Sequence, residues 1–142
     1  MKPTLVLLHS SASSARQWDA LARTLADAFD VRAIELLGHG ARAPWSGRTP
    51  LTLADEAAPV DRLIERRARV HLVGHSYGGA VALDVARRHP HAVRSVAVYE
   101  PVLFGCLAAN AASASQARAA RALAADVHAH VDPGYDDAAA ER

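Results

Sequence analysis

The sequence predicts a three-layer α/β fold in which a parallel sheet of about four strands is covered by helices on both faces. Four short apolar runs recur along the 142 residues, and they are Thr4–Leu8, Val31–Leu36, Val70–Val73 and Arg94–Val98. Each of the first three is followed by a turn signal and then by a helix-like stretch. Continuous apolar strands that alternate with helices indicate parallel strands buried on both faces.

The first helix is predicted to begin near Ser14. Ser14 and Gln17 have the spacing of a capping box, in which each side chain satisfies a free backbone donor at a helix start. One helical face then carries the large apolar side chains Trp18, Leu21, Leu25 and Phe29.

The second helix should follow Thr52, with Asp55 three residues later as a similar cap, and Pro59 is expected to kink or restart it. Its buried stripe is predicted to be Val60, Leu63 and Ile64. A third helix over residues 77–88 is apolar around much of its circumference and should therefore be central and buried. His89-Pro90 ends it.

The character of the chain changes after Pro101. Residues 107–131 are rich in alanine and serine and predict a weakly amphipathic, lid-like helix. The expected organisation is therefore a partial core over residues 1–106 and a lid-like helical segment over residues 107–142. The acids around Ala138–Ala140 are typical of the first turn of another helix, and a single turn is not stable alone, so we expect a truncated chain.

Composition narrows the classes of partner. The net charge of +1 gives no electrostatic argument for nucleic acid, and no stretch approaches the roughly 20 apolar residues of a membrane span. Cys106 is the only cysteine, which fits a reducing compartment, and we expect a cytoplasmic protein that acts on a small-molecule substrate. Nothing in the sequence indicates an oligomeric state.

The strongest chemical signal is Gly74-His75-Ser76-Tyr77-Gly78-Gly79, which contains the pattern G-x-S-x-G. The pattern follows a predicted strand and opens a predicted buried helix, which is the setting of a nucleophile elbow. Gly74 and Gly78 are the small residues that so tight a turn requires on either side of a serine. Ser76 is therefore the candidate nucleophile, and the start of the following helix faces developing negative charge.

At this point the chain resembles the α/β-hydrolase superfamily over residues 4 to about 104. His9-Ser10, after the first strand, resembles the family's His-Gly turn, with serine where the family usually has glycine. The resemblance implies that the backbone N–H groups of Ser11 and Tyr77 form the oxyanion hole. It also implies that the strand at Thr4–Leu8 lies between those at Val31–Leu36 and Val70–Val73, with the fourth strand beyond.

Two further segments carry the resemblance. Gly38-His39-Gly40 is similar to the family's G-H-G loop, although Glu35 stands where aspartate is frequent and Arg42 where serine is frequent. Residues 98–101, Val-Tyr-Glu-Pro, are similar to the turn after the strand that follows the elbow helix. Serine at the elbow argues against the branches that use an aspartate nucleophile.

Competing motifs fail on spacing. Gly38-x-Gly40 lacks the rest of a dinucleotide fingerprint, and no P-loop is present. His71 and His75 fall on a strand and a turn rather than on one helix, and His128 and His130 are not neighbours on a helix, so no zinc site is expected. No metal and no organic cofactor is implied.

A serine nucleophile needs a histidine base and an orienting acid, which in this fold follow the serine in the order acid, then histidine. His89 and His91 come about 12 residues after Ser76, or about 18 Å along a helix, and are excluded. His128 and His130 lie in the lid-like segment, and Glu100 is either a triad acid or an ordinary loop residue.

The sequence therefore predicts an α/β-hydrolase family protein that uses Ser76 to hydrolyse an ester, thioester or amide in its intact form. The alternative is a catalytically incomplete fragment or pseudo-hydrolase that acts as a binding module. We expect the 142-residue chain alone to show little or no turnover.

Overall fold

The computed structural model describes residues 2–66, 69–103, 115–116, 118–119 and 122, and it divides the chain into two compact units, residues 1–102 and 103–142. In the second unit, Ser115, Gln116, Arg118, Ala119 and Ala122 are helical and exposed. The rest of the predicted lid-like segment, residues 107–142, lies outside the described residues, so the lid-like helix stays a prediction.

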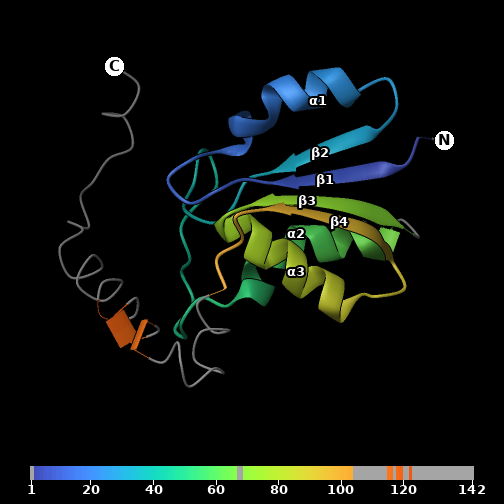
Figure 1. Ribbon diagram of the computed structural model, residues 1–142. Helices are drawn as coiled ribbons and strands as arrows, with labels where there is room; N and C mark the ends of the chain where they lie inside the picture. The colour runs from blue at the N-terminus through green and yellow to red at the C-terminus, as the bar shows by residue number, and fades with distance from the viewer. Residues whose placement is uncertain (1, 67–68, 104–114, 117, 120–121, 123–142) are drawn as a thin grey trace, which may run out of the picture. The chain divides into compact units, whose positions relative to one another are not determined.

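The first unit is a parallel sheet with helices on both faces, as predicted (Figure 1). Its elements are β1 (Thr4–Leu8), the 3-10 helix η1 (Ala15–Trp18), α1 (Asp19–Leu25), β2 (Asp30–Ile34), α2 (Leu53–Arg66), β3 (Val70–His75), α3 (Tyr77–Arg88) and β4 (Val93–Tyr99). The strand order is β2-β1-β3-β4 and every neighbouring pair is parallel, which confirms the expected topology. Figure 1 shows α1 on one face and α2 with α3 on the other.

The strand ends differ from the sequence prediction at the edge where the elbow lies. β2 ends at Ile34 rather than Leu36, because its register with β1 stops at the Leu8–Ile34 pair and the Leu36 N–H donates to the His9 ring instead. β3 continues to His75 rather than Val73, because Gly74 still pairs with Leu8 of β1 and His75 with Tyr99 of β4. Pairing on both sides therefore carries β3 right up to Ser76.

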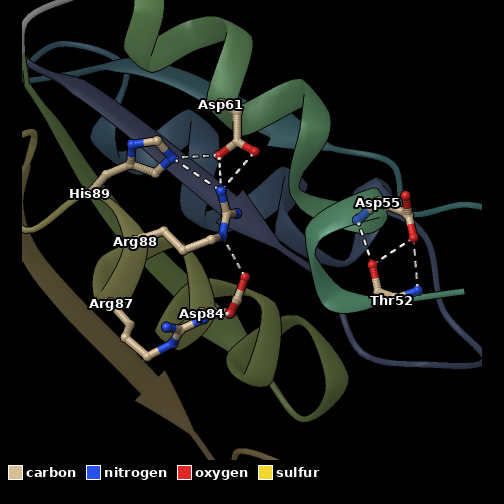
Figure 2. A network of polar contacts seen from close by, with 7 residues as sticks. All are labelled: Thr52, Asp55, Asp61, Asp84, Arg87, Arg88 and His89. Carbon is tan, nitrogen blue, oxygen red and sulfur yellow. Dashed lines mark hydrogen bonds and ion pairs between the residues drawn. The ribbon is translucent and has the colours of Figure 1, made fainter.

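One of the two predicted helix caps is correct. Thr52 and Asp55 form a reciprocal capping box: the Asp55 N–H donates to Thr52 Oγ1 at 3.2 Å, and the Thr52 N–H donates to Asp55 Oδ2 at 2.9 Å (Figure 2). The Ser14–Gln17 box was a wrong prediction, since Ser14 makes no side-chain cap and Gln17 is bound elsewhere. Tertiary contacts of Gln17 outweigh the local cap.

Helix α2 runs unbroken from Leu53 to Arg66, so Pro59 does not restart it. Ala57 and Val60, on either side of the proline, are fully buried in the core. Burial of this face holds the helix in place although the proline removes one internal hydrogen bond.

The main core lies between the sheet and the α2–α3 layer. All five residues of the central strand β1 are buried, whereas α1 buries none of its residues. The core cluster consists of Val6, Leu8, Leu36, Ala57, Val60, Val70, Leu72, Val81, Ala82 and Val85. The predicted central position of α3 is thus confirmed, and the elbow is attached to the best-packed part of the unit.

A polar network at the C-terminal end of α3 fastens this helix to α2 (Figure 2). The Arg88 guanidinium donates to Asp61 of α2 at 3.0 Å and to Asp84 one turn earlier at 2.7 Å, and His89 Nε2 lies 3.0 Å from Asp61. Burial alone would raise the pKa of Asp84, but hydrogen bonds from Arg88 and Arg87 outweigh it, so this pKa lies below its ordinary value of 3.8.

Replacing Arg88 by methionine, which keeps the apolar stem, is expected to lower the free energy of unfolding by about 1–3 kcal/mol, because two partly buried carboxylates each lose one of their two partners. Arg87→Met is the control, since Arg87 is 74% exposed and should cost less than about 0.5 kcal/mol. Asp84 has a lowered pKa when folded, so its contribution is present above pH 3.8 and is lost as the pH falls through the folded value. When the pH is lowered below 3.8, the free energy of unfolding measured in urea should therefore fall less for Arg88→Met than for the parent. An equal fall in the two proteins would contradict this.

Candidate active site

Ser76 occupies the single-residue turn between β3 and α3. Its backbone has φ 52° and ψ −115°, a conformation that L-residues rarely adopt and that typically costs about 1–3 kcal/mol. The turn is held on both sides: the Ser76 N–H donates to the Tyr99 carbonyl at 2.9 Å, and the Ser76 carbonyl accepts from Gly79, Ala80 and Val102. The predicted strained strand-to-helix turn is confirmed.

The two elbow glycines are required by close backbone approach. A Cβ at Gly74 would lie 2.4 Å from the Gly78 carbonyl oxygen and 2.6 Å from the Gly79 Cα. A Cβ at Gly78 would lie 2.4 Å from the carbonyl oxygens of both Leu8 and His9. Because Gly74 has no Cβ, α3 can fold back over β3. Because Gly78 has no Cβ, α3 can pack against the end of β1.

The loop after β1 lies beside the elbow, because the Gly78 N–H donates to the His9 carbonyl at 3.1 Å. The His9 ring is fully buried; its Nε2 accepts from the Leu36 N–H at 3.0 Å and its Nδ1 lies 2.7 Å from the Ser10 carbonyl. Burial lowers the pKa of His9, which keeps the ring neutral, with the proton on Nδ1. The ring thus joins the β1 loop to the β2 loop.

Gln17 connects the β1 loop to the elbow, a role that sequence analysis assigned instead to helix capping. Its Oε1 accepts from the backbone N–H and the hydroxyl of Ser10, and its Nε2 lies 3.0 Å from Nδ1 of His75. In the described chain, positive φ values outside glycine occur at Ala12, Ser76 and Glu100, so Ser10 needs no glycine conformation. Serine therefore fits where the resemblance expects glycine, and its hydroxyl gains a partner.

Two backbone N–H groups at this junction are free to bind an anion. Within the described residues, neither Ser11 nor Tyr77 donates its N–H to another protein group, whereas the neighbouring N–H groups of Ser10, Ser76 and Gly78 are all bound. Ser11 follows the loop at the end of β1, and Tyr77 is the first residue of α3. The geometry thus places the two predicted oxyanion donors on the two segments that the Gly78–His9 hydrogen bond joins.

The family model described as "Alpha/beta hydrolase family" matches residues 5–141 of this chain. The chain belongs to the alpha/beta hydrolase family. Among the curated relatives, the dihydrolipoyllysine-residue acetyltransferase component of an acetoin cleaving system from Cupriavidus necator is 38% identical over 72% of this chain and 27% of its own length. Lipase LipV from Mycobacterium tuberculosis is 34% identical over 71% of this chain and 38% of its own.

A pimeloyl-[acyl-carrier protein] methyl ester esterase from Aromatoleum aromaticum is 39% identical over 65% of this chain and 34% of its own. Among solved structures, a thioesterase domain from the curacin biosynthetic pathway superimposes with a TM-score of 0.64 at 27% identity, over 72% of this chain and 37% of that one. The chain thus spans between 27% and 38% of the length of these three curated relatives.

In this alpha/beta hydrolase, five of the described histidines contact groups other than the serine. His9 binds the two loops, His39 Nδ1 lies 2.9 Å from the Leu37 carbonyl, and His75 faces Gln17. His71 pairs with Ser95 and His89 with Asp61. Over the described ranges, no histidine or carboxylate is hydrogen-bonded to Ser76, and Glu100 is exposed with a φ of 46°. His128 and His130 lie outside the described residues.

The alpha/beta hydrolase unit also buries a carboxylate that sequence analysis missed. Glu56 of α2 is 1% exposed, and its Oε2 accepts from the Leu37 N–H at 2.9 Å. Its Oε1 lies 3.5 Å from the Tyr77 hydroxyl, and Arg42 Nη1 lies 4.0 Å from Oε2. A signal was available, because Glu56 comes four residues before Val60 and therefore falls on the predicted apolar stripe of its helix.

The described residues form neither a metal site nor a membrane-spanning helix. No cluster of three or more histidine, cysteine, aspartate or glutamate side chains in this part of the chain could hold a metal ion. Among the same residues, no helix is both long and apolar enough to cross a membrane.

Proposed function

We propose that this alpha/beta hydrolase is a serine hydrolase that transfers an acyl group from an ester, thioester or amide to water, with Ser76 as its nucleophile. The observation that carries the proposal is the position of Ser76 at a φ of 52° between β3 and α3, beside two free N–H groups at Ser11 and Tyr77. A strained backbone conformation that is held in place by the surrounding hydrogen bonds is typical of functional sites.

In the proposed reaction, Ser76 Oγ forms a bond to the acyl carbonyl carbon and gives its proton to a base. The negative charge that develops on the carbonyl oxygen is received by the N–H groups of Ser11 and Tyr77 and by the N-terminus of α3. The tetrahedral intermediate expels the alcohol, thiol or amine, and water then releases the acid. Among the described residues no histidine is hydrogen-bonded to Ser76, so the proposed base belongs to another part of the intact protein.

The relatives favour an ester or thioester as the substrate class, since their names include a lipase, a methyl ester esterase and a thioesterase domain. The reaction needs no metal or organic cofactor. We keep residues 107–142 as a lid-like segment in this proposal, and the single cysteine supports a cytoplasmic location.

The test is stoichiometric acylation by an activated ester such as p-nitrophenyl acetate, followed by mass spectrometry of the labelled peptide. The parent chain is expected to carry one acetyl group on Ser76, and Ser76→Ala should lose it completely. Ser13→Ala is the matched control, because it removes a serine of the β1 loop that has no assigned role. Equal labelling of the parent and Ser76→Ala would reject the proposed nucleophile.

A further inference from the structure

Glu56 is the most deeply buried carboxylate of the described chain, at 1% exposed, and the proposed reaction does not use it. A carboxylate is kept in an interior only when hydrogen bonds and charges compensate for the lost water. Glu56 has three such neighbours from two other segments: the Leu37 N–H and the Arg42 guanidinium from the loop after β2, and the Tyr77 hydroxyl from α3. Its helix, α2, thereby meets the loop after β2 and the first residue of α3.

The Tyr77 side chain is held by contacts of both its ring and its hydroxyl. Its ring packs against the core cluster, and its hydroxyl faces Glu56 Oε1. Burial first, and then the charge and hydrogen bond of Glu56, raise the pKa of Tyr77 to about 12, so the phenol stays protonated and can donate. A residue whose side chain is fixed in this way cannot turn about its own backbone without breaking these contacts.

We propose that Glu56 is a positioning residue: by holding the side chain of Tyr77 from α2, it acts together with the hydrogen bonds to the Ser76 carbonyl, which belongs to the same planar peptide group, to fix the direction of the Tyr77 backbone N–H beside Ser76. The inference deepens the proposed function and rests on it, because the N–H of Tyr77 is one of the two proposed oxyanion donors. The simpler alternative is that Glu56 only caps the Leu37 N–H and stabilises the β2 loop. The two roles differ in their consequences for Tyr77: a substitution at Glu56 alters the Tyr77 backbone N–H only if Glu56 positions it.

Four variants separate these roles. Glu56→Gln keeps an oxygen for the Leu37 N–H and a polar group for the Tyr77 hydroxyl, whereas Glu56→Ala removes both. Tyr77→Phe deletes only the hydroxyl and keeps the packing, so it tests the contact even where Glu56→Ala folds poorly. Glu65→Gln is the control, because Glu65 is an exposed glutamate on the same helix. Circular dichroism first establishes that each variant is folded.

The first measurement is the amide spectrum of the full 142-residue chain by ¹⁵N NMR. Positioning predicts that Glu56→Ala shifts the Tyr77 amide resonance, that Glu56→Gln shifts it less, and that Glu65→Gln leaves it in place. If Glu56→Ala changes the Leu37 amide but leaves that of Tyr77 unmoved, the positioning role is overturned and only the loop cap remains.

The second measurement is the rate of Ser76 acylation by the activated ester. Misplacing a reacting group by about 1 Å can slow a reaction on the order of 100-fold, and we expect about 10-fold or more for Glu56→Ala and less than about 3-fold for Glu56→Gln. In Glu56→Ala/Tyr77→Phe the losses should not add, since both act through one contact; additive losses would contradict the proposal. If Ser76 is not acylated in the parent, the proposed function fails, and the amide spectra alone decide whether Glu56 holds Tyr77.

Discussion

Gly78→Ala is expected to lose more than about 3 kcal/mol of the free energy of unfolding, enough to unfold a marginally stable domain. The added Cβ would lie 2.4 Å from the carbonyl oxygens of Leu8 and His9. Both are backbone atoms of the central strand and the loop that follows it, so neither can rotate away as a side chain could. The hydrogen bond from the Gly78 N–H to the His9 carbonyl would be broken by the same displacement. Urea or thermal unfolding followed by circular dichroism measures the loss.

Gly79→Ala is the matched control for this experiment. Its Cβ would meet nothing nearer than the Pro101 Cβ at 3.0 Å, and alanine is favoured over glycine inside a helix by about 1 kcal/mol. We therefore expect its stability to stay within about 1 kcal/mol of the parent. A Gly78→Ala variant as stable as Gly79→Ala would show that α3 does not approach β1 as closely as described here.

The 142-residue chain is expected to show little or no multiple turnover of an activated ester. General-base assistance is typically worth about 10²–10⁴-fold, and within the described residues no histidine reaches Ser76. The proposed oxyanion donors at Ser11 and Tyr77 would still leave residual catalysis of about 10³–10⁴ over water. Steady-state release of p-nitrophenol, compared between the parent and Ser76→Ala, measures what remains.

A second experiment measures ester hydrolysis in the presence of an added base. Imidazole should raise the rate of the parent by more than that of Ser76→Ala, because it supplies a proton acceptor that no described histidine provides to Ser76. Robust turnover without imidazole that depends on Ser76 would contradict the prediction and would make His128 or His130 the candidate base. Solubility must be followed throughout, because β4 is an edge strand of the described sheet, with Val98 39% and Tyr99 62% exposed.

The sequence patterns predicted the four parallel strands, the limits of α3 and the strained turn at Ser76, whereas the strand order came from the resemblance to the α/β-hydrolase superfamily. The first three follow from local patterns: apolar runs mark parallel strands, and glycines two residues either side of a serine permit one tight turn. The capping box at Thr52 and Asp55 belongs to the same class, since all its atoms lie within four residues. The sequence patterns assigned no triad acid and no triad histidine.

Only the tertiary structure decided how residues distant in sequence use their polar groups. Gln17 has the local spacing of a helix cap, yet it binds Ser10 and His75, because those partners come within reach only when β1 and β3 pair. Glu56 likewise finds Leu37 and Tyr77 only once α2 packs beside the sheet and α3. A sequence pattern records what neighbours along the chain can do, whereas a buried polar group must bind whatever donor or acceptor the fold brings to it.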